Sequence, residues 1–385
     1  MVSFYLTIFK SNYVFNIYNK VNISNLITKY EKKLTHIMDY DSENLSSDLY
    51  FESGIRKGKF LPKGLFKSFL GINIPEIPFY RTTQKASPCI SEMILEIIHF
   101  KKEFQYLSSN NTCKFFGENA FEKIKILYIV TTNIGENEGT KNFKSTKEAL
   151  SKKEKFIIKS NTMKDANVET KKINVNSFER VSINIYAAIE HLEKINTGDD
   201  MGLLDVEECI QDTHFLLMNK LLKDDKRGRF STSRRFAGES HEYPRFSSEE
   251  DAYQRVLIIV DQYNDTVNFI KNSDFLDISR KYSLYFICAA WILHKFVSLH
   301  PFADGNGRMG RLLASYCLYL VCPFPCPIFN IHNPTTTRNI YLNSVISADK
   351  SEKEGLQTLT ALLIESAWYS YKCLLKYIKE DGIIN

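Results

Sequence analysis

Two arginines and two glycines near residue 305 form the part of this sequence best suited to hold phosphate. Gly305 and Gly307 precede an apolar stretch of helical length, so they lie in a turn that exposes backbone N–H groups at a helix N-terminus. Arg308 and Arg311 are three residues apart and share one face of that helix. Two guanidinium groups on one face can each bind a phosphate group, so the pattern predicts a polyphosphate site.

Two further side chains with chemical potential lie in the same segment, 300–311, whose sequence is HPFADGNGRMGR. Asp304 offers a hard oxygen ligand, as Mg²⁺ bound to a nucleotide requires. Histidine has an ordinary pKa near neutrality, so His300 is the candidate base. A phosphate cradle, a metal carboxylate and a base together predict phosphoryl or nucleotidyl transfer.

Apolar periodicity predicts that helices position this segment. It lies between two apolar stretches of helical length, 276–299 and 307–321. One strand-like interruption, 229–246, surrounds Gly238 and predicts a β-hairpin. The expected fold class is therefore mainly α with one small hairpin. Further helices are predicted over 91–107, 120–134, 178–195, 203–222, 248–271, 334–348 and 355–379.

Composition and charge restrict the classes of partner. The chain has 385 residues, of which 44% are hydrophobic and 25% charged, a mixture typical of globular domains. Its formal charge is +5, but residues 140–173 contain ten lysines against four acids, a local +6. The rest of the chain therefore sums to −1, and no nucleic-acid partner is expected.

The chain is expected to divide into three segments. These are an N-terminal region, 1–139; a Lys-rich linker, 140–176; and the domain that carries the motif, 177–379. The N-terminus is apolar but lacks a basic leader and a small-residue cleavage site, which disfavours a signal peptide. The apolar stretch 282–299 contains a histidine and a lysine, so it predicts a buried core helix rather than a membrane span. A cytoplasmic protein is expected.

The segment 300–311 resembles the signature of Fic (Fido) domains, His-Pro-Phe-x-Asp/Glu-Gly-Asn-Gly-Arg-x-x-Arg, and matches it at every fixed position. The resemblance covers residues 177–377. It implies a Fic-type helical core with a β-hairpin flap, preceded by an N-terminal helical or irregular region. It also implies a Mg²⁺-dependent protein adenylyltransferase, which transfers AMP from ATP to a hydroxyl group of a protein and releases pyrophosphate.

The resemblance implies a role for each residue at the centre of the motif. His300 would be the general base that takes the proton from the target hydroxyl. Asp304 would hold Mg²⁺ on the nucleotide phosphates. Gly305, Asn306 and Gly307 would form the anion hole, with the side chain of Asn306 on the α-phosphate.

The remaining nucleotide contacts come from the end of the motif and from the helix after it. Arg308 and Arg311 would bind the outgoing phosphates. Tyr341 falls where family members place an aromatic side chain against the adenine, although an ordinary core tyrosine explains the same residue equally well.

The hairpin would act as the flap that docks the target protein. The flap would span 228–246, with Phe230, Thr232 and Tyr243 as its docking residues. The implied partner is a protein with an acceptor Ser, Thr or Tyr. Self-modification and a homodimer are both compatible with this assignment.

A second family motif, Ser/Thr-x-x-x-Glu-Gly/Asn, lies on a helix that blocks the nucleotide site in many relatives. Thr132 and Glu136 are the one match among the Glu-Gly and Glu-Asn dipeptides of this chain, and they lie on an expected inhibitory helix near 120–137. Residues four apart share a helix face, so Glu136 would point into the site and pair with Arg311. The resemblance therefore implies a self-inhibited enzyme.

Two other functions remain open from the sequence. The same site would serve the reverse reaction, removal of AMP from a modified protein, with Glu136 orienting a water molecule. Alternatively, the site would hold ATP without turnover, as a nucleotide-sensing module.

Overall fold

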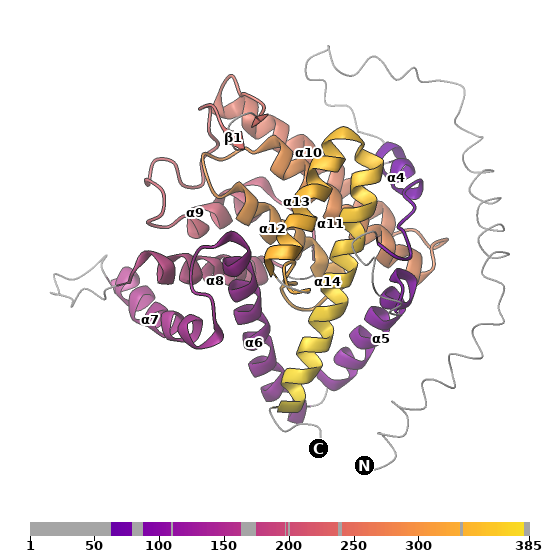
Figure 1. Cartoon of the computed structure of the whole chain (residues 1–385), viewed down its shortest axis with the longest axis horizontal. Coiled ribbons are helices and arrows are strands. Elements are labelled where there is room, and N and C mark those ends of the chain that lie inside the picture. The colour runs from indigo at the N-terminus through magenta and orange to yellow at the C-terminus, as the bar shows by residue number, and fades with distance from the viewer. Residues whose placement is uncertain are drawn as a thin grey trace. The chain divides into compact units, whose positions relative to one another are not determined.

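A computed structural model describes residues 63–78, 88–108, 111–162, 175–196, 198, 201–237, 241–331 and 334–380 of this chain. All of them belong to one unit, Phe60–Asn385, and residues 1–62 of the expected N-terminal region lie outside the described residues. The described part is mostly helical, as the sequence predicts (Figure 1). Its α-helices are α4 (Lys63–Leu70), α5 (Ile90–Ser108), α6 (Asn111–Glu136), α7 (Phe143–Thr162), α8 (Ser177–Ile195), α9 (Thr213–Leu217), α10 (Glu249–Lys271), α11 (Ile278–Leu299), α12 (Asn306–Cys317), α13 (Pro334–Lys350) and α14 (Glu352–Glu380).

Helix α11 is the core helix that leads into the motif. Asp277 caps its N-terminus by accepting a hydrogen bond from the backbone N–H of Arg280 at 2.8 Å. Its apolar side chains are buried on most faces because α5, α10, α12 and α14 all contact it. Among the helices that the structure describes, α11 is the one long and apolar enough to cross a membrane, and its burial fits the predicted core helix.

Helix α12 packs unusually close to α11, and a glycine makes this possible. A Cβ atom at Gly310 would lie 2.7 Å from Cγ1 of Val297, closer than real carbon contacts allow. The first turns of α12 therefore lie directly against the last turns of α11. This packing brings His300, at the end of one helix, near the N-terminus of the other.

The N-terminal helices belong to the same core as α11, which differs from the predicted domain division. Met93 and Ile97 of α5 and Ile124 and Tyr128 of α6 are each at most 1% exposed and join the central hydrophobic cluster. The structure shows no separate N-terminal unit ending at residue 139 within the described residues. The apolar faces of α5 and α6 are covered by α14, which returns across both (Figure 1).

The expected Lys-rich linker is largely helical. Helix α7 contacts both α6 and α8, and it buries Thr146 and Ala149 completely. Asn142 begins the helix by accepting a hydrogen bond from the N–H of Ser145. Lys144 and Lys147 lie on the exposed side, so the lysine-rich composition gave no sign of a helix with one narrow buried face.

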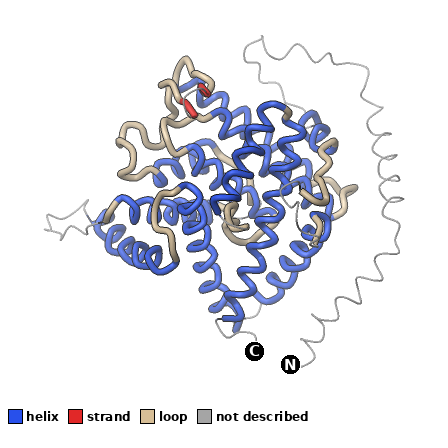
Figure 2. The backbone as a smooth tube through the Cα atoms, viewed as in Figure 1, coloured by secondary structure: helices blue, strands red, loops and turns tan. Residues whose placement is uncertain are grey.

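Two other elements are more irregular than predicted. The stretch 203–222, predicted as one helix, is a π-helical turn, Val206–Asp212, followed by the short α9. Figure 2 shows one small β-hairpin: β1 (Phe236–Ala237) pairs antiparallel with β2 (His241–Glu242). The hairpin lies in the predicted region, although its turn at Gly238 falls outside the described residues.

Candidate active site

His300 ends helix α11 in a conformation that presents its ring to the site. Its backbone adopts a left-handed conformation, with φ 51°, and its N–H still closes the helix by donating to the carbonyl of Phe296 at 2.9 Å. The ring Nδ1 lies 3.2 Å from the carbonyl oxygen of Val297, which can only accept, so Nδ1 carries the proton. Nε2 is therefore the unprotonated nitrogen of the neutral ring, as a base requires.

The flap covers the ring of His300. Tyr243 stacks on it, with ring centroids 3.7 Å apart and planes at 12°. Burial lowers the pKa of His300 to about 4; the hydrogen bond to Val297 opposes this shift, and the positive charge of Arg235 adds to it. His300 is therefore neutral at physiological pH.

Asn306 stabilises the loop between α11 and α12, residues 300–305, through its side chain. This segment is called the motif loop below. Its Oδ1 accepts from the N–H of Phe302 at 2.9 Å, and its Nδ2 donates to the carbonyl of Phe302 at 2.8 Å. The residue is 1% exposed. Nδ2 carries a second N–H beyond the one bonded to Phe302, so the expected contact between this side chain and an α-phosphate stays a prediction.

His214 is a residue of this site that the sequence analysis missed. Its Nδ1 accepts from the N–H of Gly228, so Nε2 carries the proton and donates to the carbonyl of Asp304 at 3.0 Å. Its ring also stacks on Phe302, with centroids 3.6 Å apart and planes at 1°. Burial lowers the pKa of His214 to about 4, so the neutral form that makes both bonds persists at neutral pH. A short helix after a π-turn carries no periodic signal that could have singled it out.

The N-terminus of α12 is a candidate anion site. Gly305 precedes the helix with φ 78°, and a Cβ atom there would lie 2.6 Å from the sulfur of Met218. No side chain of the described residues caps this terminus, so its first backbone N–H groups remain available to a ligand. Asp304 is exposed beside it, with Oδ1 accepting from the N–H of Gly305 at 2.6 Å.

Arg308 and Arg311 are held beside this terminus with unused hydrogen-bond donors. The side chain of Arg311 is 2% exposed and that of Arg308 is 12% exposed. Within the described part of the chain, Nε and Nη2 of Arg311 and Nη1 of Arg308 have no hydrogen-bond partner. Buried guanidinium donors without acceptors favour an anionic ligand at this place.

Glu136, at the end of α6, lies against Arg311. Its carboxylate is 2.8 Å from Nη1 of Arg311, the pair expected from the inhibitory motif. Gly135 permits this approach because a Cβ atom there would lie 2.5 Å from the ring of Phe329. Thr132, one turn earlier, is buried at 5% exposure. Burial alone would raise the pKa of Glu136, but the nearby arginines outweigh this and hold it below its ordinary value.

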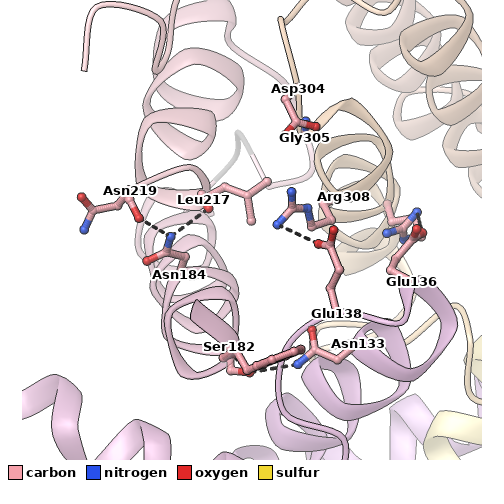
Figure 3. Close-up of polar contacts among 12 residues, drawn as sticks. Asn133, Glu136, Glu138, Ser182, Asn184, Leu217, Asn219, Asp304, Gly305 and Arg308 are labelled. Atoms are coloured by element: carbon pink, nitrogen blue, oxygen red, sulfur yellow. Dashed lines mark hydrogen bonds and ion pairs between the residues drawn. The ribbon is translucent and has the colours of Figure 1, made fainter. Parts of the chain in front are cut away.

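Two further charged residues enter this contact, and the sequence analysis missed both. Arg338 of α13 lies with its Nε 3.3 Å from the second oxygen of Glu136. Glu138 lies 3.7 Å from Nη1 of Arg308, as Figure 3 shows. Each residue is separated from the motif in the sequence and follows no recognisable spacing, so only the folded chain reveals it.

A buried polar cluster fixes the segment that carries these two glutamates. Asn133 donates to the hydroxyl of Ser182 at 2.9 Å (Figure 3) and to the carbonyl of Thr140 at 2.9 Å. The hydroxyl of Thr140 lies 2.7 Å from that of Ser182. The turn between α6 and α7 is therefore attached to α8, and Glu136 and Glu138 start from an ordered backbone.

The expected flap residues divide into two groups. Phe230 is 4% exposed and pairs with Phe302 in an isolated β-bridge, so it supports the motif loop and cannot dock a target as predicted. Thr232 is exposed, and Tyr243 covers the ring of His300. These two remain available as docking residues.

Tyr341, the expected adenine contact, lies in the wall of the site. It is 3% exposed, and its ring packs against Phe329 with centroids 5.7 Å apart. The guanidinium carbon of Arg311 lies 6.0 Å from its ring centroid. The ring is covered in this structure, and the core-tyrosine interpretation fits this position better.

A family model described as Fic/DOC family matches residues 204–318. The chain is 33% identical over 144 residues to a Fido domain-containing protein of Dictyostelium discoideum, a match that covers 34% of this chain and 91% of that protein. The chain therefore belongs to the Fic (Fido) family, whose members are transferase-type enzymes.

Solved structures share the fold. Fic-1 (residues 134–508) from C. elegans superposes with a TM-score of 0.51 at 18% identity, covering 76% of this chain and 74% of that one. A Fic domain-containing signaling protein from Bacteroides thetaiotaomicron also gives a TM-score of 0.51, at 16% identity, covering 76% of this chain and 99% of that one.

Proposed function

We propose that this chain transfers AMP from ATP to a hydroxyl group of a target protein and that Glu136 inhibits the transfer. One observation carries the proposal: arginine donors without hydrogen-bond acceptors lie on the first turns of a helix whose N-terminus has no side-chain cap, and a neutral histidine precedes that helix. This set suits a triphosphate and a hydroxyl nucleophile together. Family membership alone leaves the transferred group open.

The residues present also suit Mg²⁺ bound to the nucleotide. Among the described residues no cluster of three His, Cys, Asp or Glu side chains could hold a metal alone. Mg²⁺ commonly uses one or two carboxylates together with substrate phosphates. Asp304 is exposed at the anion site and would supply the one carboxylate. The ion would supply charge neutralisation of the phosphates.

In the proposed reaction His300 removes the proton from the target hydroxyl through Nε2. The hydroxyl oxygen forms a bond to the α-phosphorus, the bond from that phosphorus to the β-phosphate oxygen breaks, and pyrophosphate leaves. The backbone N–H groups of α12 would hold the α-phosphate. Arg308 and Arg311 would hold the departing phosphates, whose negative charge grows as the bond breaks.

The contact with Glu136 supports inhibition of this reaction. Its carboxylate occupies the guanidinium of Arg311 that the leaving phosphates would use. A phosphate at the same place is repelled by the carboxylate and loses Nη1 of Arg311 as a donor, so the productive arrangement of ATP is disfavoured while the pair is intact.

Labelled ATP tests the proposal in cell lysate with the Glu136→Gly variant. Relative to the same lysate without the variant, we expect additional label on proteins from ATP labelled at the α-phosphate and no additional label from ATP labelled at the γ-phosphate. The double variant Glu136→Gly/His300→Ala is the matched control and should transfer neither. Label from the γ-phosphate would indicate phosphorylation and contradict AMP transfer.

The reverse reaction stays a second candidate because Glu136 is ordered beside the site and is ionised. Incubation of the wild-type chain with an AMP-modified protein in the absence of ATP separates the two directions. Release of free AMP by the wild type, and its loss in Glu136→Gly, would favour removal over transfer.

A further inference from the structure

The carboxylate of Glu136 lies between two arginines, and only one of them belongs to the motif. One oxygen is 2.8 Å from Nη1 of Arg311, and the other is 3.3 Å from Nε of Arg338. Arg311 comes from α12 and Arg338 from α13, so two helices form a binding site for a single anion. This site, made by Arg311 and Arg338, is called the seat below. The carboxylate shows what kind of group this seat accepts.

The seat would be electrostatically costly without an anion. Arg311 is almost fully buried, and two of its nitrogens already have no hydrogen-bond partner within the described residues. If Glu136 left, two guanidinium groups would face each other with no counter-charge between them. An anion that replaces the carboxylate would remove this cost, and a phosphate group offers oxygens at a similar spacing.

Arg338 differs from Arg311 in its access to a ligand. Its side chain is 33% exposed, whereas that of Arg311 is 2% exposed. A third arginine, Arg308, lies close enough for its charge to lower the pKa of Glu136 as well. Three cations thus act on the position of one carboxylate.

We propose that Arg338 is a third phosphate-binding arginine, which holds the terminal phosphate of a nucleoside triphosphate together with Arg311 after Glu136 has left the seat. The inference rests on the proposed function, since it assigns the ligand of the same site. It makes Glu136 and the terminal phosphate alternative occupants of one seat. A nucleoside diphosphate lacks that phosphate, so Arg338 also makes the site selective for triphosphates.

Calorimetry with Mg-ATP and Mg-ADP tests this role without any target protein. In the Glu136→Gly background, Arg338→Gln should weaken ATP binding by roughly tenfold or more, the loss typical of a charged hydrogen bond, and leave ADP binding unchanged. Arg338→Lys keeps the charge and should recover part of the ATP affinity. Lys350→Gln, on an exposed side chain of the same helix, is the matched control and should change neither affinity.

The opposite role predicts a different pattern. If Arg338 only holds Glu136 in place, Arg338→Gln in the wild-type chain would strengthen ATP binding, and in Glu136→Gly it would change nothing. That pattern, or an equal loss of ATP and ADP affinity, would overturn the inference. Circular dichroism of each variant shows whether the fold is intact.

The binding measurements also separate this inference from the proposed function. ATP binding that depends on Arg338, with no label transferred to any protein, would count against AMP transfer and leave the seat for the terminal phosphate intact. If label is transferred but the affinity for ATP does not depend on Arg338, AMP transfer would stand and the role of Arg338 would be contradicted.

Discussion

The two halves of the site are stabilised in different ways. The motif loop is held mainly through its backbone: Asn306 binds Phe302, and His214 binds the carbonyl of Asp304. The segment that carries Glu136 and Glu138 also has a fixed backbone, attached through Asn133, and it reaches the arginines of the motif through the charged ends of these two side chains.

Because of this difference, we expect substitutions in the two parts to change different properties of the protein. Removing a side chain that holds the motif loop leaves buried polar groups without partners and costs stability. Removing Glu136 frees two cations, removing Glu138 frees one, and both changes leave the buried cluster intact. We therefore expect loop variants to lose activity and segment variants to gain it.

The largest effect is expected for His300→Ala. Loss of the base should lower the transfer rate by ~10²–10⁴-fold, because the target hydroxyl would keep its proton. The affinity for Mg-ATP should change little, since His300 lies outside the phosphate cradle. Rates and calorimetry in the Glu136→Gly background check both parts, and an unchanged rate would remove His300 from the mechanism.

His214→Phe tests the motif loop. The variant retains a ring to stack on Phe302 but leaves the N–H of Gly228 and the carbonyl of Asp304 without their partner. We expect a loss of about 1–3 kcal/mol in the free energy of unfolding, with weaker Mg-ATP binding.

Thermal and urea unfolding measure this stability, and an ATP titration reports on the loop. His214→Gln, which can both donate and accept, should recover part of each quantity. Wild-type stability and ATP affinity in His214→Phe would show that the two bonds are dispensable.

The pH dependence of the transfer rate tests whether Tyr243 shields the ring of His300. The unprotonated ring is the active form, so transfer should stay constant from pH 7 to 5 and fall near pH 4, where the ring is protonated. Tyr243→Ala exposes the ring, so its pKa should rise toward the ordinary value of about 6.5, and the acid limb should move up with it. Tyr243→Phe retains the stacking and should keep the limb near pH 4; identical profiles for all three proteins would contradict the assignment.

The smallest effect is expected for Glu138→Gln. Glu138 is 55% exposed and 3.7 Å from Arg308, so its pair contributes no more than about 1 kcal/mol. We expect at most a few-fold rise in transfer, less than for the buried pair of Glu136. A larger rise than in Glu136→Gly would reverse the ranking of the two contacts.

Sequence patterns predicted the helices and the motif because both depend on local spacing. The 3.6-residue period located α10 and α11 to within two residues at each end, and the motif located the uncapped N-terminus of α12. Glu136 also came from a short motif. The lysine-rich composition predicted a linker where α7 forms, because the buried face of this helix is narrow. Phe230 was predicted to dock a target, because its partner Phe302 lies far along the chain and no local pattern reveals that contact.

His214 and Arg338 could not be predicted for the same reason. Each acts through a partner more than 80 residues away, His214 on Asp304 and Arg338 on Glu136. No local pattern distinguishes either residue from an ordinary histidine or a surface arginine. Such contacts follow from the packing of α9, α12 and α13 and not from spacing.

The most direct test of the account is the rate of AMP transfer by Glu136→Gly relative to the wild type, measured as self-labelling with ATP labelled at the α-phosphate. Because the carboxylate and the phosphates require the same arginine, we predict a rise of at least about tenfold, as removal of one charged contact would produce. Equal rates in the two proteins would show that the pair of Glu136 with Arg311 does not restrain the enzyme and would contradict the central claim.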